Sequence, residues 1–344
     1  MQLPREVIVG EGVIERVAEI SRRLGFTESA LIITGQKTYD VAGKTVEETL
    51  EKEGVEAKTH IVKSATIKDV EAVEERIRIL KPQVVFGVGG GTKIDVAKLS
   101  SARQKVPFIS VPTTASHDGI ASPLSSVKGL EKPFSVMAQA PIAIIADTNI
   151  IAQTPHRFIA SGCGDVIAKF TAVRDWKLAY MDRNEYYGEY AASLALMSAR
   201  LIMRNANLIK PQNEEGLRVL LEALISCGVA MSIAGSSRPC SGSEHLFSHA
   251  LDMIKPNNAL HGEQCGVGTI VMAYLHGANW KNIRETLKTV GAPTNAYELG
   301  LSREDVVKAL FMAPSIRPER YTILNKLELS FEECERIAKI TGVI

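Results

Sequence analysis

The first half of the chain alternates short apolar runs with amphipathic stretches. The apolar runs predict buried strands at residues 7–9, 30–34, 57–62, 84–88, 107–111 and 142–146. Residues with helical periodicity lie between them, at 13–24, 46–52, 67–80 and from the glycines after residue 88 to about 103. Strands that alternate with helices of this length pair in parallel through right-handed crossovers. We therefore predict an open α/β sheet with helices on both faces.

The pattern changes near residue 150. Beyond it strand signals almost disappear, and helical periodicity dominates at residues 157–181, 185–207, 216–234, 243–253 and 266–274. A chain of 344 residues also exceeds the size at which one hydrophobic core usually keeps growing. We therefore predict two domains, an α/β domain at residues 1–150 and an all-helical domain at residues 151–344.

A run of glycines follows the apolar strand at residues 84–88. The glycines are residues 87, 89, 90 and 91, and a predicted helix begins directly after them. Glycine lets backbone N–H groups approach a ligand, and a helix N-terminus favours negative charge. We expect a pyrophosphate there, although the spacing does not match the G-x-G-x-x-G dinucleotide fingerprint. The alternative is a turn that only packs the helix closely on the sheet.

A loop rich in small and hydroxyl-bearing residues follows the strand at residues 107–111. Thr113, Thr114 and Ser116 can bond a phosphate, a ribose or a nicotinamide carboxamide. Asp118 can accept a hydrogen bond from a substrate hydroxyl. Because ligands of open α/β sheets bind outside the carboxyl ends of the strands, we expect this loop and the glycines on one rim. The alternative is a loop whose Ser, Asp, Gly and Pro residues only form turns.

Three segments of the helical half are spaced like a metal site. Asp165 follows two glycines at a predicted helix start, and His245 and His249 lie four residues apart on one helix face. His261 precedes a glycine that would free the backbone around it. One carboxylate and two imidazoles form a three-ligand divalent site with an open position, which suits zinc and also iron. The alternatives are an N-cap for Asp165 and a solvated or packed helix face for the histidines.

Charge and cysteine content narrow the class of protein. The chain has 40 basic and 39 acidic residues and no run of like charge, so we expect no nucleic acid and no membrane as main partner. Five cysteines without a C-x-x-C pair indicate a reducing cytoplasm. No signal peptide is visible at the N-terminus. The apolar stretch 217–234 contains Arg218 and Glu222, and we interpret it as a buried helix rather than a membrane span.

In order along the chain, the segments GGGTKIDVAK, PTTASHDGIASP, SGCGDVIAK, SEHLFSH and LHGEQ resemble those of the NAD(P)-dependent glycerol-1-phosphate dehydrogenases. These enzymes share a superfamily with glycerol dehydrogenases, iron-containing alcohol dehydrogenases and dehydroquinate synthases. The late segment APSIRPERYTIL resembles the branch with phosphorylated substrates. The resemblance implies an N-terminal Rossmann-like domain that binds the dinucleotide and an all-α C-terminal domain that binds metal and substrate. It also implies an active site in the cleft between them.

The resemblance implies roles for individual residues at the cofactor. The cofactor would be NAD or NADP, since Gln36 and Lys37 replace the acidic residue that selects NAD, and Thr38 would lie near the adenosine ribose. The other implied cofactor contacts are Gly91, Thr92, Lys93, Ile94, Asp95, Thr113, Thr114, Ala115, Ser116 and Ser122.

The same resemblance implies a metal and substrate site. One zinc ion per subunit would be held by Asp165, His245 and His261. Asp118, Asp165 and His249 would contact the substrate and act as the catalytic residues. A substrate phosphate needs cationic or amide donors, and the unranked candidates are Arg238, Lys255, Arg317 and Arg320.

The implied reaction is the reduction of dihydroxyacetone phosphate to sn-glycerol 1-phosphate with NADH or NADPH, a step of archaeal-type phospholipid precursor synthesis. The alternatives are a dehydroquinate synthase-type lyase, a glycerol or iron-type alcohol dehydrogenase, and a metal or dinucleotide sensor without catalytic activity. The apolar helical domain also leads us to expect a homo-oligomer.

Overall fold

Residues 2–129, 135–256 and 258–344 are described by the computed structural model of the chain. Their contacts divide the chain into two compact units. The sheet unit comprises Met1–Thr154 and Pro211–Ser232, and the helical unit comprises Pro155–Lys210 and Ile233–Ile344. A segment from the second half of the chain therefore belongs with the first half, an arrangement that the periodicity did not predict.

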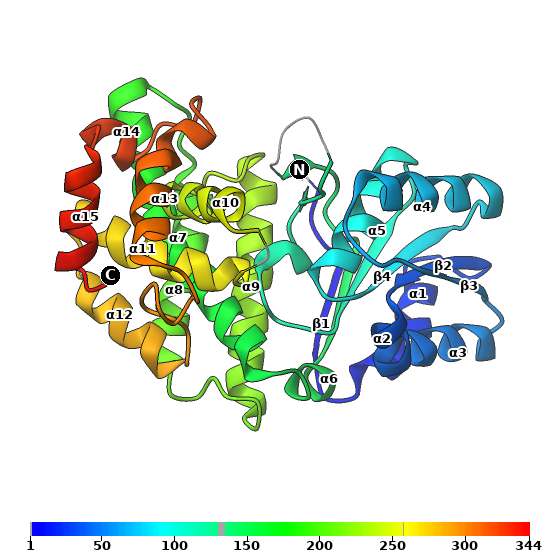
Figure 1. Ribbon diagram of the computed structural model, residues 1–344. Helices are drawn as coiled ribbons and strands as arrows, with labels where there is room; N and C mark the ends of the chain where they lie inside the picture. The colour runs from blue at the N-terminus through cyan, green and yellow to red at the C-terminus, as the bar shows by residue number, and fades with distance from the viewer. Residues whose placement is uncertain (1, 130–134, 257) are drawn as a thin grey trace. The chain divides into compact units, whose positions relative to one another are not determined.

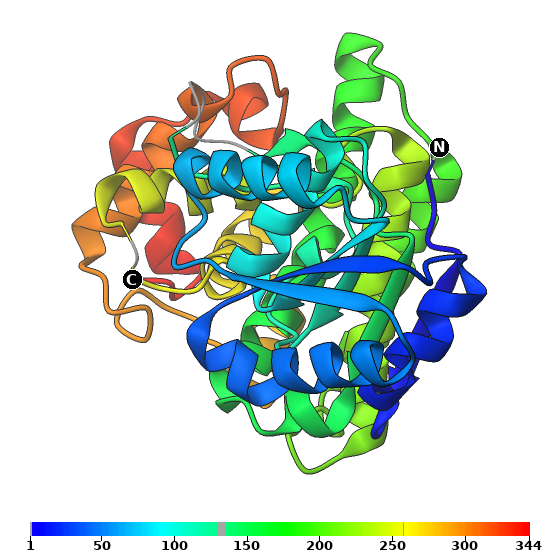
Figure 2. The same cartoon turned by 90° about the vertical axis from the view of Figure 1, so that its right-hand side faces the viewer.

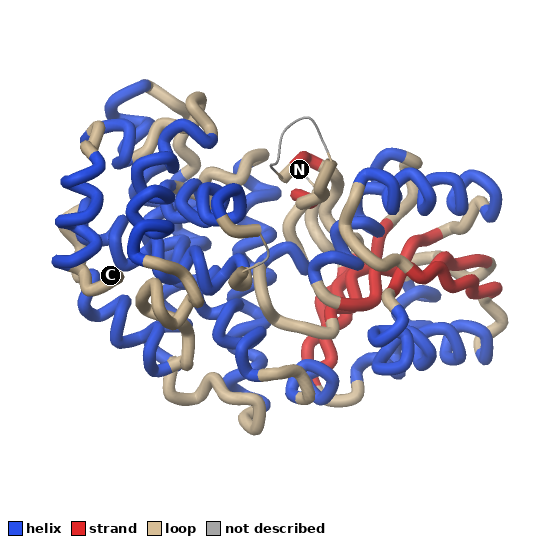
Figure 3. The backbone as a smooth tube through the Cα atoms, viewed as in Figure 1, coloured by secondary structure: helices blue, strands red, loops and turns tan. Residues whose placement is uncertain are grey.

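Six parallel strands form the main sheet of the sheet unit, drawn in red in Figure 3. In spatial order they are β1 (Glu6–Gly10), β8 (Ala143–Asp147), β5 (Phe108–Pro112), β4 (Val84–Gly89), β2 (Ser29–Thr34) and β3 (Glu56–Ile61). All neighbouring pairs are parallel, which confirms the predicted α/β sheet.

The strand order reverses between β2 and β4. The chain passes outward from β2 to β3 and then returns to β4 on the other side of β2. The carboxyl ends of β2 and β4 therefore flank a topological switch point, which is where open α/β sheets bind ligands.

Helices cover both faces of this sheet (Figures 1 and 2). Helices α4 (Ile67–Leu80) and α5 (Gly91–Arg103) lie on one face, and α1 (Val17–Arg23) and α3 (Lys44–Lys52) lie on the other. Every residue of β4 is buried, as expected for a central strand of a sheet that is covered twice.

Shorter elements complete the sheet unit. They are η1 (Val13–Arg16), α2 (Gln36–Thr38), η2 (Tyr39–Gly43), η3 (Asp118–Ile120), α6 (Thr148–Ala152) and the antiparallel pair β6 (Leu124–Ser125) and β7 (Val136–Met137). The pair β6–β7 was not predicted, because strands of two residues are too short to show a period.

Helix α9 (Glu214–Ala234) is the segment that returns to the sheet unit. By length and composition alone it could cross a membrane, but 61% of its most apolar window is buried within the structure. A Cβ atom at Gly228 would lie 2.5 Å from the carbonyl carbon of Ala121, so the helix packs closely on the loop after β5. The prediction of a buried helix is confirmed.

No strand occurs in the described part of the helical unit (Figure 3), which confirms the predicted all-helical C-terminal domain. Its helices are α7 (His156–Arg183), α8 (Glu189–Asn205), α10 (Ser243–Ile254), α11 (His261–Leu275), α12 (Trp280–Thr289), α13 (Arg303–Ile316), α14 (Ile323–Leu327) and α15 (Phe331–Ile340).

Asp175 connects several of these helices from the middle of α7. Its fully buried carboxylate accepts hydrogen bonds from the N–H groups of Ser243 and Ile323, both at 2.7 Å. The Nε2 atom of His276 lies 3.0 Å from the same carboxylate. One acidic side chain thus satisfies the N-terminus of α10 and the start of α14, which positions the helix that carries His245 and His249.

Candidate active site

The glycine loop joins β4 to α5. Gly89 has a φ of 151°, and a Cβ atom there would lie 2.8 Å from Cγ of Lys93, so a side chain would be strained. Gly90 is the N-cap of α5, and its carbonyl accepts the N–H groups of Lys93 and Ile94 at 2.9 and 3.2 Å. The first N–H groups of a helix have no intrahelical acceptor, so this loop offers donors to an anionic ligand.

The loop after β5 lies against the glycine loop. The N–H of Thr113 donates to the carbonyl of Gly89 at 3.0 Å. A Cβ atom at Gly90 would lie 3.3 Å from Oγ1 of Thr114, and one at Gly91 would overlap the imidazole of His117. The structure therefore brings the predicted cofactor-binding segments of the sheet unit side by side.

Thr38 and Lys93 lie at the switch point between β2 and β4. Oγ1 of Thr38 accepts the N–H of Gly35 at 2.9 Å and lies 2.8 Å from Oγ1 of Thr34. A Cβ atom at Gly35 would lie 2.5 Å from Cε of Lys93. Burial lowers the pKa of Lys93, and its Nζ donates to the carbonyl of Lys63 at 3.2 Å. The side chain of Lys93 on α5 therefore lies against the turn that precedes α2.

Asp95 and Lys98 form a buried pair that supports the loop at residues 118–125. Nζ of Lys98 lies 3.4 Å from Oδ1 of Asp95 and donates to the carbonyls of Gly119 and Leu124 at 2.7 and 2.6 Å. Burial raises the pKa of Asp95 and lowers that of Lys98. Oγ of Ser122 donates to the same Leu124 carbonyl at 3.3 Å. These contacts are structural, and the cofactor contacts of Asp95 and Ser122 stay predictions.

Four other predicted positions in the sheet unit differ in exposure. Ile94 and Ala115 are fully buried, whereas Thr92 is exposed and Ser116 is half-buried. Asp118 is half-buried and begins η3, where its carbonyl accepts the N–H groups at residues 121 and 122, both at 3.0 Å.

The three predicted metal ligands come together in the helical unit. Oδ1 of Asp165 on α7 lies 3.6 Å from Nε2 of His245 on α10. The ring centroids of His245 and His261, the first residue of α11, are 4.9 Å apart. Ligand atoms of His245, His261 and Cys265 lie within 4.8 Å of one another. The structure thus adds Cys265 to the three residues that the sequence predicted.

A buried lysine controls the charge of Asp165. Nζ of Lys169, one turn later on α7, donates to Oδ1 of Asp165 at 2.7 Å, and both side chains are buried. Burial alone would raise the pKa of Asp165, but Lys169 and then the imidazoles of His245 and His261 hold it well below its usual range. Asp165 is therefore ionised and can bind a cation.

Second partners orient both imidazoles. Nδ1 of His245 lies 2.8 Å from Oε1 of Glu244, so Nδ1 carries a proton, and Nε2, 3.6 Å from Oδ1 of Asp165, is the atom that would bind a metal ion. Oγ of Ser248 donates to Oε1 of Gln264 at 2.6 Å, so it accepts from Nδ1 of His261 at 3.1 Å. Each ring thus presents Nε2. Two such nitrogens beside a carboxylate and a thiol are ligands that zinc takes, so the residues fit a divalent ion.

His249 lies beside this cluster on the same helix as His245. Its ring centroid is 6.0 Å from that of His261. Burial, and then the positive charges of His245, Arg317 and Arg320, lower the pKa of His249 to about 3. The ring is therefore neutral near pH 7 and is suited to hydrogen bonding.

Comparisons with known proteins identify the family of this chain. A family described as "Iron-containing alcohol dehydrogenase" matches residues 8–155. The chain is 56% identical, over all of its 344 residues, to a protein named glycerol-1-phosphate dehydrogenase (NAD(P)+) in Thermococcus sibiricus, of which it covers 98%. It is also 56% identical to the protein of that name in Pyrococcus furiosus, of which it covers 99%. The chain belongs to the glycerol-1-phosphate dehydrogenase family. The resemblance seen in the sequence motifs is thereby confirmed.

Solved structures show that this member of the family has the glycerol dehydrogenase fold. The glycerol dehydrogenase of Schizosaccharomyces pombe superposes with a TM-score of 0.82 at 20% identity, over 98% of this chain and 89% of that one. A sulfoacetaldehyde reductase from Bifidobacterium kashiwanohense, solved with NAD+, superposes with a TM-score of 0.75 at 18% identity, over 99% of this chain and 98% of that one. At such identities the likeness shows the fold alone.

Two local predictions for this family member were wrong. Asp165 does not lie at a helix start, because α7 begins nine residues earlier at His156 and continues through both glycines. His261 does not precede a freed backbone, because α11 begins at His261 and Gly262 is helical. Gly164 and Gly262 instead allow α7 and α11 to approach closely: a Cβ atom at Gly262 would overlap the carbonyl of Ser161. The close crossing of α7 and α11 requires residues without a side chain at these positions, so helix packing and not a turn explains the two glycines.

Sequence reasoning missed three side chains near the predicted sites. They are His117 against Gly91, Lys169 on Asp165, and Cys265 beside His261. Cys265 lies four residues after His261, a spacing that places both on one helix face and could have been noticed. Lys169 follows Asp165 at the same spacing, which on a helix is typical of an ion pair.

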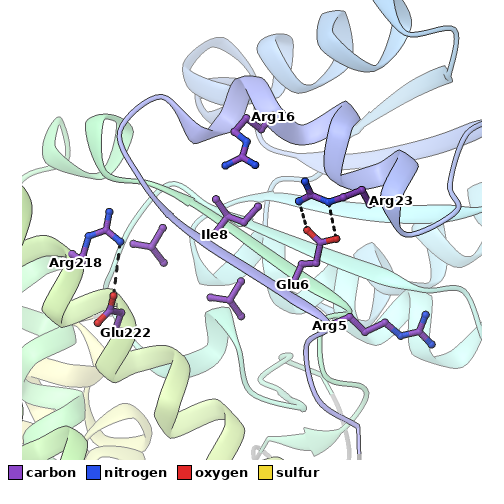
Figure 4. Close-up of a pocket in the computed structure, with 9 residues that line it drawn as sticks. Arg5, Glu6, Ile8, Arg16, Arg23, Arg218 and Glu222 are labelled. Carbon is purple, nitrogen blue, oxygen red and sulfur yellow. Dashed lines mark hydrogen bonds and ion pairs between the residues drawn. The ribbon is translucent and has the colours of Figure 1, made fainter.

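A separate hollow of about 590 Å³ lies along β1, between that strand, α1 and α9 (Figure 4). Arginines and glutamates line it, and ion pairs hold several of them: Arg23 bonds Glu6 at 2.5 Å, and Arg218 bonds Glu214 at 3.2 Å and approaches Glu222 at 3.9 Å. No predicted site residue lines this hollow among the described residues. It therefore supports no role in binding the cofactor, the metal or the substrate.

Proposed function

We propose that the chain catalyses the reversible reduction of dihydroxyacetone phosphate to sn-glycerol 1-phosphate with NADH or NADPH. The observation that carries this proposal is the full-length identity of 56% to proteins named glycerol-1-phosphate dehydrogenase (NAD(P)+). The cluster of Asp165, His245 and His261 supports it, because a carbonyl reduction needs a group that stabilises charge on the substrate oxygen.

The rim at β2, β4 and β5 is the proposed cofactor site. The N-terminus of α5 offers N–H donors to the pyrophosphate, and the neighbouring hydroxyls of Thr113 and Thr114 can bond phosphate, ribose or carboxamide. Thr38 stands at the end of β2, next to the glycine loop, where an adenosine ribose would be in reach. Because Gln36 and Lys37 carry no negative charge, we propose that both NADH and NADPH are accepted.

The proposed metal is one zinc ion per subunit, held by Asp165, His245 and His261, with Cys265 as a further candidate ligand. A bound zinc ion would supply a Lewis acid for the C2 oxygen of the substrate. Lys169 keeps Asp165 ionised. Glu244 and Ser248 bond Nδ1 of the two imidazoles, which leaves Nε2 of each ring as the nitrogen that would bind the metal.

Two further side chains are proposed to contact the substrate. The neutral ring of His249 would donate a hydrogen bond to a substrate oxygen, and the carboxylate of Asp118 would accept a hydrogen bond from a substrate hydroxyl. A neutral imidazole with a pKa of about 3 is a weak base, so a water molecule is the better proton carrier.

We also propose that the protein works in a reducing cytoplasm and as a homo-oligomer. All five cysteines lie in the described ranges, are buried, and form no disulfide there. Buried free thiols suit a compartment that keeps cysteine reduced.

A spectrophotometric assay tests the function. The purified, zinc-loaded protein should oxidise NADH and NADPH in the presence of dihydroxyacetone phosphate and should do so far less efficiently with unphosphorylated dihydroxyacetone. Equal activity on both substrates would favour a glycerol-type dehydrogenase. Cofactor binding without any net oxidation would contradict the proposal and favour a dehydroquinate synthase-type lyase or a sensor.

A further inference from the structure

Two loops of the helical unit bring three arginines together, and we call this group the arginine cluster. Arg238 belongs to the loop between α9 and α10, and Arg317 and Arg320 belong to the loop between α13 and α14. Nη1 of Arg238 donates to the carbonyl of Tyr321 at 3.0 Å, and Nη1 of Arg320 donates to the carbonyl of Ser241 at 2.5 Å. Each loop therefore donates an arginine hydrogen bond to a backbone carbonyl of the other loop.

A turn places two of the three guanidinium groups. In the sequence Arg317-Pro318-Glu319-Arg320 the N–H of Arg320 donates to the carbonyl of Arg317 at 2.9 Å. Proline at the second position presets the φ angle that such a β-turn needs. The two arginines are thus the first and fourth residues of one turn, whose Cα atoms approach within about 7 Å.

Arg320 is buried among neutral hydrogen-bond partners. Only 8% of the residue is exposed. Its hydrogen bonds go to two neutral groups, the carbonyl of Ser241 and the hydroxyl of Ser237 at 2.7 Å, and it makes no ion pair within the described residues. Burial, and then the charges of Arg317 and Arg238, lower its pKa to about 9, so it stays charged at neutral pH. Glu185 and Glu244 attract this charge without pairing with it, and a bound anion would stabilise the buried guanidinium further.

The other arginines differ from Arg320 in this respect. Arg238 forms a two-pronged ion pair with Glu185, with Nε 2.5 Å from Oε1, so its charge is neutralised. Arg317 bonds Glu319 at 3.2 Å through Nε, but the carboxylate of Glu319 is 64% exposed. Screening by solvent makes such an exposed pair weak. Arg320 is therefore the member of the cluster that makes no ion pair with a described carboxylate.

The arginine cluster lies close to the proposed metal site. Helix α13, which ends at the turn, packs beside α10, which carries His245 and His249 (Figure 1). The positive charges of Arg317 and Arg320 act on His249, whose ring is 6.0 Å from that of His261. A three-carbon substrate with one end at the metal ligands could therefore reach the cluster with its other end.

We propose that Arg320, with Arg317 beside it, binds the phosphate group of the substrate. This rests on the proposed function, and it ranks the four cationic candidates that the sequence left unranked. A phosphate dianion matches the planar fork of a guanidinium and would compensate its charge. Arg238 is excluded because Glu185 neutralises it, and Lys255 is excluded because it is exposed and donates to the carbonyl of Gly300 at 3.0 Å.

The competing explanation is that Arg320 only ties the two loops together. Substitutions of Arg320 distinguish the phosphate-binding role from the loop-connecting role when the stability and the phosphate affinity of each variant are both measured. Arg320→Met removes both the charge and the hydrogen bonds. Arg320→Gln removes the charge but keeps a donor for the Ser241 carbonyl. Arg336→Met on α15 removes an exposed arginine and is the matched control.

The experiment compares kcat/KM for dihydroxyacetone phosphate with kcat/KM for dihydroxyacetone, and measures binding of inorganic phosphate by calorimetry. The ratio of the two kcat/KM values should fall about 10- to 100-fold in Arg320→Met and Arg320→Gln, because a hydrogen bond to a charged group is lost. Phosphate binding should weaken by a similar factor. Arg336→Met should keep the wild-type ratio and phosphate affinity.

Thermal unfolding identifies the variants that are folded. If either folded Arg320 variant keeps the wild-type ratio and phosphate affinity within twofold, the phosphate role is overturned and the tie between loops remains. Failure of the proposed function gives a different result: the wild-type protein would not turn over dihydroxyacetone phosphate, although phosphate would still bind in a manner that depends on Arg320.

Discussion

Nζ of Lys169 lies 2.7 Å from Oδ1 of Asp165, and neither side chain reaches solvent. The two residues are one helical turn apart on α7, so the helix itself fixes their approach. The ammonium compensates the carboxylate that we propose as a zinc ligand. When zinc is bound, it adds a second positive charge to the same carboxylate.

Lys169→Met should therefore destabilise the metal-free protein more than the zinc-loaded protein. Without zinc, the substitution leaves a buried carboxylate without its partner, which costs about 3–5 kcal/mol of unfolding free energy. With zinc, the metal compensates Asp165 and the loss should be smaller. Urea unfolding with and without zinc measures both values.

Lys98→Met is the matched control for this prediction. Lys98 is also fully buried and pairs with a carboxylate on its own helix, at Asp95, but it belongs to the sheet unit. The loss of unfolding free energy in Lys98→Met should therefore be the same with and without zinc. A loss for Lys169→Met that is equal with and without zinc would show that Asp165 does not bind the metal.

The two candidate ligand sets can be told apart, because they share His245 and His261 and differ in Asp165 or Cys265. If Asp165 is the ligand, Asp165→Asn should lower zinc affinity by 100-fold or more, and Cys265→Ser should change it by less than about threefold. Competition with a chromophoric chelator measures the affinity.

Cobalt provides an independent check on Cys265. A thiolate ligand gives a sulfur-to-metal charge-transfer band, so a cobalt-substituted protein without such a band would agree with Asp165 as the ligand. A strong band that disappears in Cys265→Ser would assign the third position to Cys265 instead.

Gly91→Ala should weaken binding of the nicotinamide cofactor. A Cβ atom at this position would overlap the imidazole of His117, so the ring and the loop that carries Thr113 and Thr114 must shift. We expect a loss of at least tenfold in NADH affinity by fluorescence titration, since displaced donors no longer meet the cofactor. The double variant Gly91→Ala with His117→Ala should recover most of the affinity. A double variant as weak as Gly91→Ala alone would mean that the overlap with His117 is not the cause.

Gly262→Ala should destabilise the helical unit. The added Cβ atom would overlap the backbone carbonyl of Ser161, which cannot move aside as a flexible side chain can. Separation of α7 and α11 should cost about 3 kcal/mol. The same shift moves His261 relative to Asp165, so zinc should be lost at a lower chelator concentration.

Gly277→Ala serves as a comparison for Gly262→Ala. Gly277 has a φ of 64° and open space around its Cβ position, so alanine there costs only backbone strain, about 1–2 kcal/mol. Its zinc affinity should equal that of the wild-type protein. A Gly262→Ala protein with wild-type stability and zinc affinity would contradict the close packing of the two helices.

The fold class could be predicted because it depends on periodicity. Alternating apolar runs and amphipathic stretches predict a parallel sheet with helices, and their disappearance after residue 150 predicts a helical unit. Periodicity says nothing about partners distant in sequence. The return of α9 to the sheet unit therefore could not be predicted, because its packing against Ala121 depends on a contact across about a hundred residues of chain.

The candidate site was predicted in part. Asp165, His245 and His261 were recognised by residue type and motif order, and the structure brings them together. The start of α11 was missed, because glycines at positions 262, 266 and 268 weaken the helical signal that packing against neighbouring helices restores.

By itself, the sequence determined most of the longer strands and helices, which polar residues are available, and which family the motifs resemble, since these depend on local order along the chain. Only the tertiary structure decided which charges are compensated. Arg238, Arg317, Arg320 and Lys255 are equivalent cations in the sequence, yet in the part of the chain that the structure describes Glu185 pairs with Arg238 and leaves the buried Arg320 without an ion pair. The reason is physical: the energy of a charge depends on its solvation and its neighbours, and folding alone assigns both.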